Sequence, residues 1–174
     1  MKTRVILPIL ILAAAGQAHA QRHYTGIEGI EVNGGSNIFH GTAPCFSVEY
    51  SKYRSRRSFW KVGMNYLEKK YDREEESQNA DNIYLDASYN RTVATNRTSL
   101  FLNLGLGALA GTEIYKQEKK QYDFIAGGKL EAEVELFVAS RTAVVGHISQ
   151  LWSPLSDIRK WDTTWQIGIK YLIY

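Results

Sequence analysis

Several features are scarce in this sequence, and each scarcity excludes a class of protein. A single cysteine among 174 residues excludes a disulfide-stapled miniprotein and a zinc ribbon built on several thiolates. Three prolines exclude collagen-like material. After residue 20 there is no run of about 18 apolar residues, so no helical membrane span is expected in that part of the chain. Charges nearly balance, with 21 Lys and Arg against 18 Asp and Glu, which makes nucleic-acid binding a poor first hypothesis.

The sequence does contain enough apolar and aromatic residues for one folded domain. Hydrophobic residues make up 44% of the chain, and they include four Trp, 11 Tyr and six Phe. A chain of this composition can bury a core and is not expected to be disordered.

The N-terminus is typical of a secreted protein. Lys2 and Arg4 precede an apolar run over residues 5–15, and a small-x-small cleavage site, Ala-His-Ala, ends at residue 20. We therefore expect residues 1–20 to be a signal peptide and residues 21–174 to be the mature domain. The apolar run is shorter than the roughly 20 residues of a membrane-spanning helix, so an uncleaved anchor is the less favoured alternative.

The mature chain shows the period-2 alternation of β-strands. The clearest case is residues 100–107, where four leucines alternate with Phe, Asn, Gly and Gly. The last case, residues 165–174, places Trp, three Ile and a Tyr on one face. The eight expected strands lie within residues 29–34, 46–51, 60–66, 83–89, 100–107, 129–136, 142–152 and 165–174.

The links between these segments alternate in length, which is typical of an outer-membrane barrel with short periplasmic turns and longer outer loops. The longest link, residues 67–81, is a mixed-charge run expected to be a solvated loop. The sequence therefore predicts an all-β fold, a single eight-stranded antiparallel up-and-down β-barrel of outer-membrane type over residues 21–174. Aromatic residues near the strand ends predict two interfacial girdles: Tyr50, Tyr53, Phe59, Trp60, Tyr66, Tyr71, Tyr89, Tyr115, Tyr122, Trp152, Trp161 and Tyr174.

Alternation alone does not orient the barrel, because a soluble periplasmic binding barrel would place the same apolar face inward. Glycines on the polar face favour the membrane orientation, since the interior of an eight-stranded barrel is narrow. In that orientation the polar face fills the lumen with a paired structural network and conduction is not expected. The expected members are Glu31, Glu49, Asp86, Glu131, Glu133 and Glu135 with Lys61, Lys129 and Lys170.

Three stretches carry a resemblance to a known family. They are Gly29 to Val32, Leu102 to Leu106 leading into Ala110 to Glu113, and Asp123 to Ile125 followed by Gly127 to Leu130. In this order they resemble the conjugal transfer protein TraO family of Bacteroidetes conjugative transposons. The resemblance implies a small envelope component of a type IV secretion-like apparatus at the outer membrane, without catalytic residues to carry over.

One catalytic alternative rests on His147 and Ser149, which share a strand face two residues apart. An imidazole beside a hydroxyl is the minimum for an activated nucleophile, and outer-membrane lipid A deacylases use a similar His-x-Ser arrangement. The orienting carboxylate would come from Asp157 or Asp162. The competing interpretation is that both residues are ordinary barrel positions.

No metal or cofactor site is expected, because His23, His40 and His147 are widely spaced and Cys45 has no partner thiol. A basic group, Arg54, Arg56 and Arg57, is interpreted as solvated charge or a docking contact rather than a nucleic-acid site.

The favoured hypothesis is a non-enzymatic conjugation component at the outer membrane, with other conjugation proteins and outer-membrane lipid as partners. No direct nucleic acid, small-molecule substrate or cofactor is expected. A lipid A-modifying hydrolase and a soluble periplasmic binding barrel are the alternatives.

Overall fold

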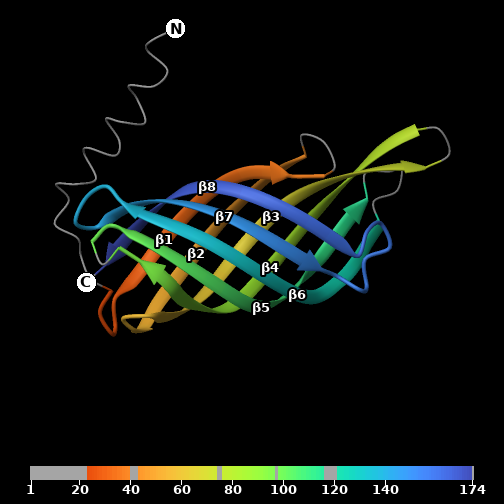
Figure 1. The fold of residues 1–174 in the computed structure, drawn as a ribbon. Helices are drawn as coiled ribbons and strands as arrows, with labels where there is room; N and C mark the ends of the chain where they lie inside the picture. Colours follow the sequence, from red (N-terminus) through yellow and green to blue (C-terminus); the bar gives the residue numbers. More distant parts are fainter. Residues whose placement is uncertain (1–22, 40–42, 74–75, 97, 116–120, 174) are drawn as a thin grey trace, which may run out of the picture.

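The computed structural model describes residues 23–39, 43–73, 76–96, 98–115 and 121–173, which form one closed barrel of eight tilted strands (Figure 1). The strands are β1 (Glu28–Asn37), β2 (Pro44–Ser55), β3 (Ser58–Arg73), β4 (Glu76–Thr95), β5 (Leu100–Tyr115), β6 (Gln121–Phe137), β7 (Thr142–Trp152) and β8 (Trp161–Ile173). Each strand pairs antiparallel with the next, and β8 pairs with β1 to close the barrel. The predicted up-and-down topology is confirmed. The signal peptide predicted for residues 1–20 lies outside the described residues.

The first strand begins where the last strand ends, since Glu28 pairs with Ile173. We call this end of the barrel the terminal end, and it also carries the links 56–57, 96–99 and 138–141. The opposite end, called the loop end, carries the links 38–43, 74–75, 116–120 and 153–160. Among the described residues, no helix is long and apolar enough to cross a membrane.

The two faces of the wall differ in the way that alternation predicts for a membrane barrel. Outward residues are apolar, such as Val32, which is 59% exposed, and Leu106, which is 66% exposed. Inward neighbours are polar and buried, such as Glu31 and Lys61, at 1% and 0% exposed. This arrangement contradicts the alternative of a barrel with an apolar, ligand-binding interior.

The prediction of a loop over residues 67–81 is wrong. Strand β3 continues to Arg73 and β4 begins at Glu76, and the two pair along their whole length (Figure 1). In the described pairing with β2, strand β3 goes no further than Leu67, so the two-stranded ribbon extends past the barrel wall. Its polar sequence hid the strands, because the segment lacks the alternation of apolar and polar residues by which a strand is predicted.

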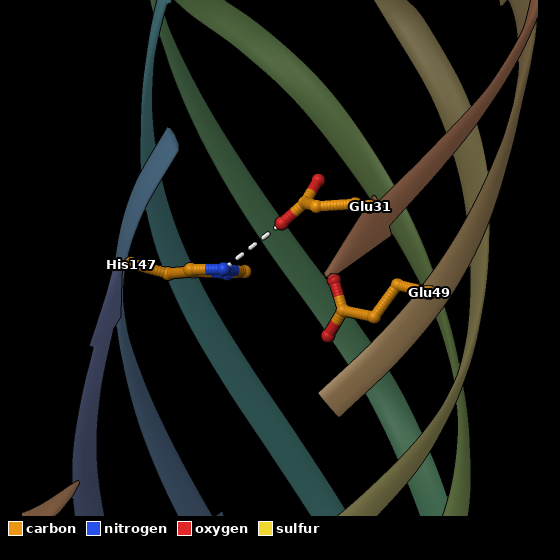
Figure 2. A group of neighbouring side chains, drawn as sticks. All are labelled: Glu31, Glu49 and His147. Atoms are coloured by element: carbon orange, nitrogen blue, oxygen red, sulfur yellow. Dashed lines mark ion pairs between the residues drawn. The ribbon is translucent and has the colours of Figure 1, made fainter. Parts of the chain in front are cut away.

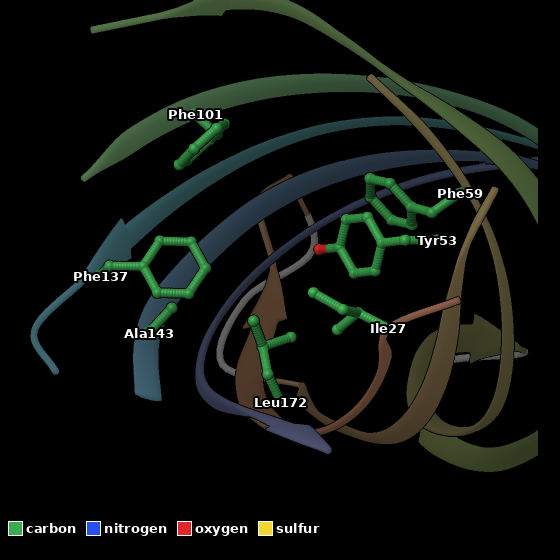
Figure 3. Packing of buried hydrophobic residues seen from close by; sticks show 7 residues of the cluster. All are labelled: Ile27, Tyr53, Phe59, Phe101, Phe137, Ala143 and Leu172. Atoms are coloured by element: carbon green, nitrogen blue, oxygen red, sulfur yellow. The ribbon is translucent and has the colours of Figure 1, made fainter. Parts of the chain in front are cut away.

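Both ends of the barrel interior are apolar. At the terminal end a cluster that we call the terminal plug fills the lumen (Figure 3); its members are Ile27, Tyr53, Phe59, Phe101, Phe137, Ala143 and Leu172. At the loop end a second cluster contains Cys45, Leu67, Tyr84, Leu109, Ile125 and Leu151. Tyr53, Phe59 and Tyr115 were expected in the girdles, but all three are buried inside the barrel. All three side chains point into the lumen. The girdles were predicted from closeness to a strand end, and that criterion does not tell which way a side chain points.

Two glycines show how little space the lumen leaves. A Cβ added at Gly105 would collide with Oδ1 of Asn90, and one added at Gly168 would collide with Oδ1 of Asn33. The expectation that glycines on the polar face make room in a narrow interior therefore holds at these positions.

Candidate functional site

Buried charged side chains fill the middle of the lumen. Lys61 on β3 is the central cation: its Nζ lies 3.0 Å from Glu49 and 2.7 Å from Glu131, and it also contacts Glu133. The Lys61 side chain is 0% exposed. A buried charge is tolerated only when it is paired and hydrogen-bonded, and Lys61 meets that condition with three carboxylates.

Two further lysines extend this network along the barrel. The Nζ of Lys129 on β6 lies 2.7 Å from Glu131, 3.1 Å from Asp86 and 3.5 Å from Glu49. On β8, the Nζ of Lys170 lies 2.9 Å from Glu133. It also lies 3.2 Å from Glu31 and 3.4 Å from Glu135. The paired network predicted from the polar face is thus confirmed, with all three lysines and all six carboxylates in it.

The strand register explains why lysines are needed to neutralise the carboxylates in the lumen. Glu31 on β1 stands directly opposite Glu49 on β2, and like charges facing each other across strands are destabilising. Lys61 sits beside Glu49 and Lys170 beside Glu31, so each carboxylate of the pair has its own cation.

His147 on β7 lies inside the same network (Figure 2). Its Nε2 is 3.0 Å from Glu31 and its Nδ1 is 3.7 Å from Glu131. Ser149 donates its hydroxyl hydrogen bond to Glu131 at 3.4 Å, so the carboxylate and not the imidazole is its partner. Both residues are buried in the lumen, at 4% and 7% exposed. They face away from the wall that a membrane lipid would reach, and this geometry does not support the hydrolase alternative.

The proposed orienting carboxylates are engaged elsewhere or exposed. Asp162 accepts a hydrogen bond from Asn37 at 2.9 Å and pairs with Arg159 at 3.0 Å. Lys69 lies 3.1 Å from the other oxygen of Asp162 and 3.1 Å from Glu113. Asp157 is exposed in the link 153–160. Lys69 is a buried cation that sequence reasoning missed, because its segment was taken for a solvated loop.

Two groups of lumen side chains have the spacing of metal ligands. Ligand atoms of Glu31, Glu49 and His147 lie within 4.8 Å of one another, as do those of Glu131, Glu133 and His147. Neither group could be predicted from sequence spacing, because the members come from β1, β2, β6 and β7. Lys61 already contacts three of these four carboxylates, so a divalent ion would have to displace an ammonium group. The arrangement fits structural charge pairing better than a metal site.

At the terminal end, His23 joins the plug to the charge network. Its ring lies 4.3 Å from that of Tyr53 and 4.2 Å from that of Phe101, and its Nε2 is 3.2 Å from Glu135. Tyr53 donates a hydrogen bond to the same carboxylate at 3.3 Å. The segment before β1 therefore folds into the lumen and helps to close it. His40 lies outside the described residues.

The outer wall is an apolar belt with aromatic residues toward both ends. Trp60, Tyr50, Tyr89 and Tyr171 are exposed near the terminal end. Exposed aromatic residues toward the loop end are Phe39, Phe46, Tyr122, Phe124, Trp152, Trp161 and Trp165. Two aromatic rims around an apolar belt match the girdles of membrane barrels, apart from the three inward residues named above. The predictions for Tyr174 and for the side chain of Tyr71 lie outside the described residues.

Fold and lumen together define a small membrane-type barrel with a filled interior. The chain belongs to the conjugative transposon protein TraO family, whose family model matches residues 25–173. This confirms the resemblance seen in the sequence. Comparison with curated proteins gives no match.

Solved structures of outer-membrane barrels share the fold. The N-terminal β-barrel domain of Pseudomonas aeruginosa OprF has a TM-score of 0.60 at 11% identity, over 87% of this chain and 100% of that one. Neisserial surface protein A has a TM-score of 0.60 at 12% identity, over 83% and 94%. The attachment invasion locus protein Ail of Yersinia pestis has a TM-score of 0.58 at 12% identity, over 86% and 99%. At these identities the likeness establishes the fold alone.

Proposed function

We propose that this protein is a non-enzymatic outer-membrane barrel of the conjugative transfer apparatus, a type IV secretion-like machine, and that it acts through protein contacts at its rims and loops. The observation that carries the proposal is the filled lumen inside an apolar outer wall. A closed interior offers no conduit, so the ends of the barrel are the surfaces available to other transfer proteins. Neither a small-molecule substrate, a cofactor nor direct nucleic-acid contact belongs to this proposal.

The orientation follows from the two ends of the barrel. Short turns are typical of the periplasmic rim of such barrels, and longer excursions lie outside. Links 56–57, 96–99 and 138–141 at the terminal end would face the periplasm. The β3–β4 ribbon and the link 153–160 would lie at the outer surface. The mature domain would begin at Gln21, after removal of residues 1–20.

Gene deletion tests the role in conjugation. We expect deletion to lower the frequency of transposon transfer and the wild-type gene to restore it. A Ser149→Ala gene should restore transfer equally, because the hydroxyl serves only to bond Glu131. Transfer that is unaffected by deletion would contradict the proposal.

The same strains test the hydrolase alternative. Lipid A from cells with and without the gene is expected to have the same mass spectrum. A change that depends on Ser149 would favour the enzyme and contradict a purely structural role.

A further inference from the structure

A group of exposed cations lies on the outer wall at the terminal end, and the function proposed above does not use it. Lys52 and Arg54 are on β2, and Arg91 is on β4. All three side chains are exposed on the same face as the apolar belt. We call these residues the wall cations.

The strand pairing places the wall cations around an aromatic pair. Lys52 pairs with Trp60 on β3, and Trp60 pairs with Tyr89 on β4. The rings of Trp60 and Tyr89 meet edge to face with centroids 5.1 Å apart. Arg91 pairs with Ser58, two residues closer to the terminal end than the Trp60–Tyr89 pair.

Arg54 reaches this row through an irregularity in β2. The register between β2 and β3 shifts between Tyr53 and Ser55, which leaves Arg54 as the extra residue of a β-bulge. A bulge re-aims a side chain, and here it leaves Arg54 exposed on the wall beside Ser58.

One of the three wall cations is paired within the protein, and the two arginines are not paired within the described residues. Lys52 pairs with Glu28 at 2.9 Å. Within the part of the chain that the structure describes, neither Arg54 nor Arg91 has a carboxylate within ion-pair distance. Two guanidinium groups therefore stand beside an aromatic pair with no anion of their own.

On the membrane side of this row the wall is apolar and slightly hollowed. Tyr50, Val62 and Ala87 form the next cross-strand row, and Val48 and Met64 the one after. A shallow hollow of about 380 Å³ begins at Val48 and Met64 and continues to Phe46 and Tyr66. From the terminal end toward the membrane, the wall therefore presents cations, then aromatic rings, then an apolar hollow. A phospholipid with its headgroup at the terminal end would contact these groups in the same order, from headgroup to acyl chain.

From this order we propose that the wall cations and the Trp60–Tyr89 pair form a binding site for an anionic phospholipid of the inner leaflet. The two arginines hold the phosphate and the acidic headgroup, Trp60 and Tyr89 lie at the glycerol level, and an acyl chain follows the wall toward the hollow. Arginine suits this role because its fork binds phosphate oxygens in pairs. The inference rests on the proposed membrane insertion with the terminal end in the periplasm.

The four tryptophans make a site-specific test possible. Trp60 lies at the terminal end, whereas Trp152, Trp161 and Trp165 lie toward the loop end. A full-length protein carrying Trp152→Phe, Trp161→Phe and Trp165→Phe therefore reports from the proposed site. It is reconstituted into phosphatidylcholine vesicles that contain brominated phosphatidylglycerol or brominated phosphatidylcholine, which quench tryptophan on contact.

We expect brominated phosphatidylglycerol to quench Trp60 at lower mole fraction than brominated phosphatidylcholine. This preference is the ratio of the two mole fractions that give equal quenching. Arg54→Gln and Arg91→Gln should each reduce the ratio about fivefold, the factor that corresponds to about 1 kcal/mol per basic residue at a membrane surface. Lys160→Gln, an exposed cation at the loop end, is the matched control and should leave the preference unchanged.

The other outcomes are distinguishable. Equal quenching by both lipids would overturn the anionic-lipid site while leaving membrane insertion intact, and quenching by neither would contradict insertion itself. Soluble inorganic phosphate at matched ionic strength should not abolish the preference, and if it does, a free anion is the occupant. Displacement of the brominated lipid by a single-stranded DNA oligonucleotide would overturn the proposal in favour of nucleic acid.

Discussion

At the scale of single residues, the lumen is distinguished by charged side chains that are buried and paired with one another. Lys61 holds three carboxylates together at the centre of the lumen, and His147 and Lys170 bind others at its edge. Period-2 alternation predicts which residues share the inner face, so the membership of this network could be inferred. It does not predict which of them touch, because that depends on register between strands far apart in the sequence.

The charge network predicts a large effect of removing its central cation. In Lys61→Met, Glu49, Glu131 and Glu133 would lose their shared partner in a buried environment. We expect the free energy of unfolding to fall by about 3–5 kcal/mol, the usual effect of breaking a buried ion pair. Urea unfolding of the protein in detergent micelles, followed by tryptophan fluorescence, measures this change.

Lys52→Met is the matched control, because Lys52 forms an exposed pair with Glu28. Exposed pairs are weak, so this variant should unfold at nearly the wild-type urea concentration. If the Lys61→Met variant also unfolded at the wild-type urea concentration, the lumen charges would not stabilise the barrel.

Elements outside the barrel wall were the hardest to predict. The β3–β4 ribbon has a polar sequence that reads as a loop. His23, which packs against Tyr53 and Phe101 of the terminal plug, precedes the first strand and belongs to no alternating pattern. Lys69 was missed for the same reason as the ribbon. Alternation detects a strand only where one face is apolar and the other polar, and these segments do not meet that condition.

The ribbon is predicted to be dispensable for folding. Among the residues that the structure describes, its outer part pairs only within itself, since the pairing of β3 with β2 ends at Leu67 and that of β4 with β5 at Ala80. Replacing residues 71–78 by a short turn should leave the unfolding midpoint and the β-sheet circular dichroism unchanged. A protein that no longer folds after this change would show that the ribbon stabilises the wall.

At the scale of the whole molecule, the barrel is a closed body with a filled interior. The terminal plug, the charge network and the loop-end cluster fill the lumen from one end to the other. Sequence alternation and glycine placement predicted the eight strands, their topology and the polar interior, whereas the length predicted for the link 67–81 was wrong because most of it is strand. The two aromatic rims were also predicted from the sequence, except where side chains near strand ends point inward.

The filled lumen predicts that the barrel does not conduct ions. Purified protein in a planar lipid bilayer should give no stepwise conductance above the bare membrane at moderate voltage. The Lys61→Met variant offers a comparison, because loosening the network should increase leakage if the charges seal the lumen. A steady wild-type conductance would contradict the closed interior.

The apolar wall is proposed to face lipid in the outer membrane. Separating membrane and soluble fractions of expressing cells and running the membrane fraction on a gel with and without boiling tests this proposal. A folded barrel resists the detergent until it is heated, so we predict recovery in the outer-membrane fraction and faster migration of the unboiled sample. A fully soluble periplasmic product without a heat-dependent shift would show that the wall does not face lipid.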